Sequence, residues 1–250
     1  MQDEMRKAVT AGAGRRNLLR AGAAAAALGA VGTPGAAMAQ ARGGARIAFA
    51  NGSAYDTMDP HATFDVGRVA YRLNLYDGLM RWLDNPPKLE PWLAESFTVS
   101  EDGKQYVFKL RQGTKFHDGT DLTAEDVVYS MERILAVNKP VTALFKALVD
   151  SGSTKARDRL TVEFNLKSAS AIFAATLHDL YVVNSALVKR NERNDDWGQE
   201  WLARNDAGSG SYILRRFDPA RGFLAQRFDQ HFLGPAGLAE IDFRYVAEVN

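Results

Sequence analysis

Residues 91–127 read PWLAESFTVSEDGKQYVFKLRQGTKFHDGTDLTAEDV. Apolar and polar residues alternate on either side of residues 101–104, where Asp-Gly suits the positive backbone angles of a hairpin turn. A second turn at residues 117–120 is followed by Thr123 and, three residues later, Asp126, which is the spacing of a helix-capping pair. The stretch therefore predicts a β-hairpin that leads into a helix. The apolar residues of the hairpin are Phe97, Val99, Tyr106, Phe108 and Leu110, and those of the helix are Val127, Val128, Met131, Ile134 and Leu135.

Strands and helices also mix on both sides of this stretch. Residues 46–50 predict a first strand, and apolar residues at helical spacing predict a helix within residues 66–80. Residues 160–166 alternate strictly, which is typical of a strand with one buried face. The remaining predicted strands are a hairpin of residues 212–217 and 223–228 and a last strand that begins at Ile241. The fold class is therefore α/β (α+β).

The composition excludes several kinds of function. The 250 residues include 31 basic and 30 acidic residues, for a net charge of +1, so no basic surface favours binding to nucleic acid. The chain has no cysteine, which excludes disulfides, thiolate metal sites and a cysteine-linked lipid anchor.

Residues 1–39 are predicted to be a signal peptide rather than part of the fold. Arg15 and Arg16 resemble the paired arginines of the twin-arginine export motif, and a mildly apolar run follows at residues 21–31. Residues 37–39, Ala-Met-Ala, match the small-x-small pattern that signal peptidase reads, so we expect cleavage after Ala39 and a location in the periplasm. A disordered alanine-rich tail with a chance arginine pair is the alternative interpretation.

Several ordered motifs resemble a known family, the extracellular solute-binding proteins of family 5, which is the oligopeptide, dipeptide and nickel class of ABC transporters. The similar segments are Asp59-Pro60-His61, LYDGL at 75–79, PWLAESF at 91–97, SEDGK at 100–104, KFHDG at 115–119, LTAEDV at 122–127 and GSGSY at 208–212. The family has threonine and proline at the positions of Ser209 and Ser211, and this departure concerns only the geometry of that turn.

The resemblance implies a periplasmic-binding-protein-like fold of two lobes that close on a solute. Residues 40–74 and 206–250 would form the first lobe, and residues 75–205 would form a subdomain inserted in it. Because the chain stops inside its last apolar strand, we expect it to be an incomplete N-terminal half that lacks the second lobe.

The resemblance also points to the segment after Asp59-Pro60-His61 as the part that approaches the solute. The predicted ligand-binding residues are Thr63, Phe64, Arg68 and Tyr71; Asn51, Ser53 and Tyr55 are weaker candidates. Aromatic rings would supply apolar contact area and Arg68 could pair with a carboxylate. The alternative is that the aromatic residues belong to the core and that Arg68 is a solvated helix charge.

No catalytic residues are predicted. His117-Asp118 reads as a turn and His178-Asp179 as a helix end, while His61 and His231 are isolated in the sequence. There is no His-Glu-x-x-His, no Gly-x-Ser-x-Gly and no phosphate loop, and no cofactor or metal site is expected.

The function implied is that of the substrate-binding component of an ABC importer, which captures peptides or a similar small solute and delivers it to a membrane permease. The expected partners are the solute, the transmembrane subunits of the permease and, during export, the twin-arginine translocase and signal peptidase. The alternatives are a cell-envelope enzyme or folding helper, or a truncated fragment without a function of its own.

Overall fold

The computed structural model describes residues 45–52, 54–63 and 69–246. The chain divides into two units, residues 1–40 and 41–250, and the described residues all lie in the second. The predicted signal peptide lies outside the described residues.

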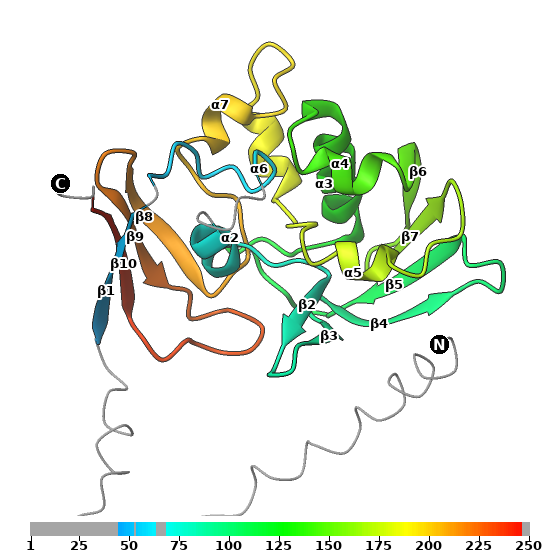
Figure 1. The fold of residues 1–250 in the computed structure, drawn as a ribbon, viewed down its shortest axis with the longest axis horizontal. Coiled ribbons are helices and arrows are strands. Elements are labelled where there is room, and N and C mark those ends of the chain that lie inside the picture. The colour runs from blue at the N-terminus through cyan, green and yellow to red at the C-terminus, as the bar shows by residue number, and fades with distance from the viewer. Residues whose placement is uncertain (1–44, 53, 64–68, 247–250) are drawn as a thin grey trace, which may run out of the picture. The chain divides into compact units, whose positions relative to one another are not determined.

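The first and last strands of the described chain pair with each other. The first sheet has the order β1 (Arg46–Asn51), β10 (Glu240–Tyr245), β9 (Gly222–Arg227) and β8 (Tyr212–Asp218) (Figure 1). β1 is parallel to β10, with Phe49 opposite Phe243, whereas the other pairs are antiparallel. The predicted strand at 46–50 and hairpin at 212–228 are confirmed, and the sheet joins segments almost two hundred residues apart.

The hairpin predicted within residues 91–127 lies in a second, antiparallel sheet. The order of this sheet is β4 (Ala94–Val99), β5 (Gln105–Leu110), β7 (Thr161–Leu166) and β6 (Val149–Asp158). Every second residue of β5 and β7 is buried, as the alternation predicts, and α3 (Ala124–Val137) packs against β6 and β7 (Figure 1). The capping pair is confirmed, since the Asp126 carboxylate accepts a hydrogen bond of 2.9 Å from the Thr123 N–H at the start of α3.

The predicted helix within residues 66–80 ends earlier than expected, at Leu75. Its described part, α2, is Val69–Leu75, and the chain continues through Gly78, which pairs with Tyr181, into a small hairpin of β2 (Met80–Leu83) and β3 (Lys88–Pro91). Residues 85–87 thus lie in the turn of this hairpin. The other helices are short: α4 (Thr142–Lys146), α5 (Phe173–Thr176), α6 (Ser185–Arg190) and α7 (Gln199–Leu202).

The described residues bury two hydrophobic clusters. One extends from Leu79 to Val182 and lies around the second sheet and α3. The other joins Tyr55, α2, the α6–α7 region and the first sheet, and it includes the partly buried Trp197 and Trp201. The chain passes between the two clusters near residues 180–183, and the domain boundaries inferred from the sequence stay a prediction.

Candidate functional site

A hollow of about 460 Å³ opens between α2, β2 and the segment 178–181. It begins at Val69, directly after the predicted solute segment 63–68, which makes it the candidate site. Its apolar and aromatic wall consists of Val69, Leu73, Tyr76, Met80, Trp82, Leu83 and Tyr181, and its polar lining includes Arg81, Asp84, His178 and Asp179. This volume and mixture of side chains are typical of small-molecule sites.

Two large apolar side chains of this pocket remain open to solvent. Leu73 is 39% exposed and Trp82 is 46% exposed. The Trp82 indole meets the His178 ring edge-on, with 6.5 Å between the ring centres. The Arg81 guanidinium lies 4.4 Å from the centre of the Trp92 ring, where a cation is attracted by the aromatic face. The pocket therefore offers apolar contact area next to charges of both signs.

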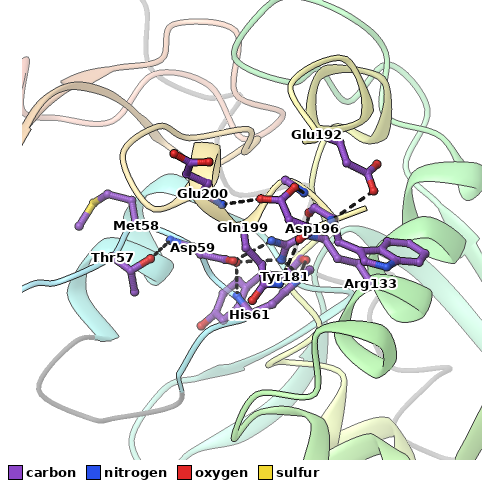
Figure 2. A network of polar contacts seen from close by, with 12 residues as sticks. Thr57, Met58, Asp59, His61, Arg133, Tyr181, Glu192, Asp196, Gln199 and Glu200 are labelled. Atoms are coloured by element: carbon purple, nitrogen blue, oxygen red, sulfur yellow. Dashed lines mark hydrogen bonds and ion pairs between the residues drawn. The ribbon is translucent and has the colours of Figure 1, made fainter. Parts of the chain in front are cut away.

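A buried ion pair joins Asp59 and Arg133 (Figure 2). The Arg133 guanidinium donates to both carboxylate oxygens of Asp59, at 2.9 and 2.7 Å, and to the Trp197 carbonyl at 2.7 Å. Arg133 is 0% exposed and Asp59 is 3% exposed. Bidentate hydrogen bonding of this kind is the strongest pairing available to an arginine and a carboxylate.

His61 completes this network as a neutral ring. Its Nε2 lies 2.8 Å from the Tyr181 carbonyl, which can only accept, so Nε2 carries the proton. Its Nδ1 lies 2.9 Å from an Arg133 nitrogen, which can only donate, so Nδ1 must present its lone pair. Burial and the nearby Arg133 charge lower the pKa of His61 from 6.5 to about 4.

This lowered pKa predicts a loss of stability in acid. Between pH 6.5 and about 4, the unfolded chain binds a proton at His61 that the folded chain does not. The free energy of unfolding should therefore fall as the pH falls through this window, by up to about 1.4 kcal/mol per pH unit from this group. Urea unfolding of the wild type and His61→Gln, which keeps one donor and one acceptor without titrating, measures the difference. Equal pH dependence in the two proteins would contradict the assignment.

The pKa of His117 is shifted in the opposite direction to that of His61. Its Nδ1 lies 2.7 Å from the Asp206 carboxylate and its Nε2 lies 3.0 Å from the Gly210 carbonyl, so both nitrogens donate. Burial alone would lower the pKa of His117, but the Asp206 charge, together with the hydrogen bonds to Asp206 and to the Gly210 carbonyl, outweighs burial and raises the pKa. The neighbouring Asp118 accepts a hydrogen bond from the Thr120 N–H, which confirms the predicted turn.

Of the four predicted ligand-binding residues, Thr63 and Tyr71 lie in the described part of the chain. Phe64, Arg68 and Ser53 lie outside the described residues. Thr63 is half-buried, and its carbonyl accepts a 2.6 Å hydrogen bond from Arg72. Tyr71 is 0% exposed, and its hydroxyl donates to the Asp59 carbonyl at 2.9 Å. Tyr71 therefore presents no open surface of its own, and its hydroxyl is bonded to the loop before α2.

The weaker candidates divide in the same way. Tyr55 is fully buried and meets the rings of Tyr71 and Phe223 edge-on. Asn51 is the last residue of β1 and lies opposite Tyr245.

Sequence reasoning missed the buried histidine networks. His61 and His231 look isolated along the chain, yet His61 bonds a residue 72 positions away and His231 lies 3.5 Å from Asp77. Burial would raise the pKa of Asp77, but the nearby His231 ring and the hydrogen bonds from Trp92 and Ser209 together outweigh burial and lower the pKa. The only signal in the sequence was the Asp-Pro-His motif itself, which does not identify its partners.

Neither a metal cluster nor a membrane-spanning helix occurs in the described part of the chain. In residues 45–52, 54–63 and 69–246, no group of three or more histidine, cysteine or acidic side chains is arranged to hold a metal ion. Across those same ranges, no helix combines the length and apolar character needed to cross a bilayer.

Comparison with known proteins identifies the family. The sequence profile of the bacterial extracellular solute-binding proteins, family 5 Middle, matches residues 88–250. The chain belongs to this family. The resemblance inferred from the sequence is therefore confirmed, and the members of this family are solute-binding proteins rather than enzymes.

Two relatives show how much of a family member the chain represents. It is 31% identical over 207 residues to the glutathione-binding protein GsiB of Shigella flexneri serotype 5b, which covers 82% of this chain and 38% of the relative. It is 35% identical over 166 residues to the "Probable D,D-dipeptide-binding periplasmic protein DdpA" of Escherichia coli K12, covering 64% of this chain and 31% of the relative. The chain thus spans less than half the length of these relatives.

Comparison with solved structures confirms the fold class inferred from the sequence. The periplasmic binding protein DppA of Helicobacter pylori, in complex with the peptide STSA, matches with a TM-score of 0.72 at 24% identity, over 84% of this chain and 44% of that protein. A dipeptide-binding protein of Pseudoalteromonas in complex with Met-Leu has the same TM-score at 18% identity, over 81% of this chain and 43% of that protein.

Proposed function

We propose that this protein is the substrate-binding component of an ABC importer, which captures peptides or a similar small solute in the periplasm and delivers it to a membrane permease. The observation that carries the proposal is the open, largely apolar pocket beside α2 in a chain of this family. The similarity to a glutathione-binding protein supports a peptide-like solute.

The chemistry of the pocket suits a short peptide. Leu73 and Trp82 offer apolar area to a side chain, Arg81 is a partner for a carboxylate, and Asp84 and Asp179 are partners for an ammonium group. Binding would be non-covalent, with a second lobe that closes over the solute before the complex docks on the permease. Thr63, Phe64 and Arg68 stay proposed ligand-binding residues, and Tyr71 would support α2 from the core.

We also propose that residues 1–39 direct export through the twin-arginine route and are removed by signal peptidase after Ala39. The order of the arginine pair, apolar run and cleavage pattern supports this proposal. The intact mass of the exported protein tests it, because retention of residues 1–39 would be inconsistent with cleavage.

The peptide site predicts the effect of removing one side chain. Glutathione, a D,D-dipeptide and Met-Leu would be titrated by calorimetry into the full-length chain. We expect at least one of them to bind and to be recovered unchanged. Trp82→Ala should raise its Kd about tenfold or more, since an exposed indole at a binding site contributes at least ~1.4 kcal/mol. The melting temperature should change little, because Trp82 is 46% exposed.

Ile172→Ala is the matched control, because Ile172 is a large apolar residue, 66% exposed, outside the pocket. It should leave the Kd unchanged. A wild-type protein that binds none of the probes would rule out the peptide assignment, and turnover of a peptide would favour the envelope-enzyme alternative. Equal Kd values for wild type and Trp82→Ala would show that the solute binds outside this pocket.

A further inference from the structure

The buried arginine on α3 makes four hydrogen bonds, and none of its partners lines the pocket. Arg133 donates to both Asp59 oxygens, to His61 Nδ1 and to the Trp197 carbonyl, at distances of 2.7–2.9 Å. These partners belong to the loop before α2 and to the loop between α6 and α7, whereas α3 belongs with the second sheet (Figure 2). Arg133 therefore joins three segments that are distant along the chain.

One connection runs from Arg133 to the α2 wall of the pocket. Arg133 fixes the Asp59 carboxylate, and the Asp59 carbonyl accepts the Tyr71 hydroxyl at 2.9 Å. Tyr71 is part of α2, as are Val69 and Leu73, which line the pocket. A shift of Asp59 would thus move the helix that carries the apolar wall.

A second connection reaches the opposite wall. Arg133 donates to His61 Nδ1, and this contact holds the ring so that its Nε2–H donates to the Tyr181 carbonyl at 2.8 Å. Tyr181 lines the pocket, and its backbone pairs with Gly78, another lining residue. The same guanidinium is therefore linked by hydrogen bonds to both walls of the pocket.

We infer that Arg133 is a positioning residue for the solute site, and that it holds α2 and the 178–181 segment at the separation that keeps the pocket open to a ligand. The inference that this separation matters for binding rests on the proposed function. The mechanical part, that Arg133 holds these two segments in place, stands on the contacts alone.

The geometry requires arginine rather than any cation. The planar guanidinium donates to two carboxylate oxygens, a ring nitrogen and a carbonyl at once, whereas a lysine ammonium is a single point with three donors. Arg133→Lys should keep the charge beside Asp59 and lose the contacts with His61 and Trp197. This variant therefore tests positioning without leaving an unpaired buried charge.

Hydrogen–deuterium exchange of the full chain, followed by peptide mass spectrometry, measures the effect. We expect exchange in residues 69–75 and 180–184 to rise by about tenfold or more in Arg133→Lys, while exchange in β5 and β7 stays as in the wild type. Arg157→Lys, at an arginine that is 46% exposed and pairs with Glu163 on the second sheet, is the control and should change neither region.

The outcomes separate the inference from the proposed function. A uniform rise, in β5 and β7 as much as in α2, would show general destabilisation and overturn the inference, as would no change in either region. Where the wild type binds Met-Leu or glutathione, Arg133→Lys should also raise the Kd about tenfold through faster dissociation; unchanged affinity despite loosened walls would overturn the link to binding. Failure of every probe to bind the wild type would refute the proposed function, and the exchange pattern alone would then decide whether Arg133 positions the two walls.

Discussion

Arg133→Met is expected to lower the free energy of unfolding by about 3–5 kcal/mol, because it leaves the Asp59 carboxylate buried without its counter-charge. Asp59 is 3% exposed, so water cannot replace the lost guanidinium. The hydrogen bond that the carboxylate keeps from the backbone N–H of His61, at 2.9 Å, comes from a neutral group. Methionine fills similar space, so the loss reports electrostatics rather than a cavity.

A double variant separates the charge effect from the loss of packing. Asp59→Asn removes the charge and keeps an oxygen that can accept the His61 backbone N–H. Asp59→Asn/Arg133→Met should therefore be more stable than Arg133→Met alone, as measured by urea unfolding. If the double variant lost as much stability as the two single variants summed, the result would contradict an ion pair that acts as a unit.

The parts of the fold that could be predicted from the sequence are those in which neighbours along the chain decide the structure. The alternation in β5 and β7 and the Thr123 cap of α3 are of this kind. β2 and β3 were missed because four residues are too few to show a period. β6 was missed because only two of its ten residues are buried.

Of the candidate site, only the side formed by α2 and the loop before it could be predicted from the sequence. The motif at residues 59–61 indicated the correct loop, but the residue that holds it, Arg133, lies 74 positions away from Asp59. A pair at that separation leaves no local pattern, and His178, on the opposite wall, looked like an ordinary helix end. The fold brings these residues together through the antiparallel sheet and α3, which no short window of sequence encodes.

The glycine turn at residues 208–212 has a Gly-Ser composition that is typical of flexible segments, yet hydrogen bonds fix it to the rest of the fold. Its backbone is held on three sides: the Gly210 N–H donates to the Leu75 carbonyl at 3.0 Å, the Gly208 carbonyl accepts from the His117 N–H, and the Ala207 carbonyl accepts from the Asn184 N–H. The turn thus connects the end of α2 with the segment after the second sheet's hairpin and with the start of α6. Its glycines serve close packing and not mobility.

Gly208→Ala is therefore expected to destabilise the protein by about 3 kcal/mol or more, at the upper end for overpacking. A Cβ at Gly208 would lie 1.8 Å from the Leu75 carbonyl oxygen and 2.9 Å from its carbon. Both atoms are backbone atoms at the end of α2, so no rotamer change can relieve the clash. Relief requires α2 or the turn to move, and either movement breaks the hydrogen bond between Gly210 and Leu75.

Gly237→Ala provides the comparison, because a Cβ there meets nothing within 4 Å. Thermal unfolding should show Gly237→Ala close to the wild type and Gly208→Ala unfolding many degrees lower, or failing to fold. Equal melting temperatures would mean that the turn is as loose as its composition suggested. Because Leu75 follows the pocket residue Leu73 on the same helix, a folded Gly208→Ala should also weaken solute binding, whereas Gly237→Ala should not.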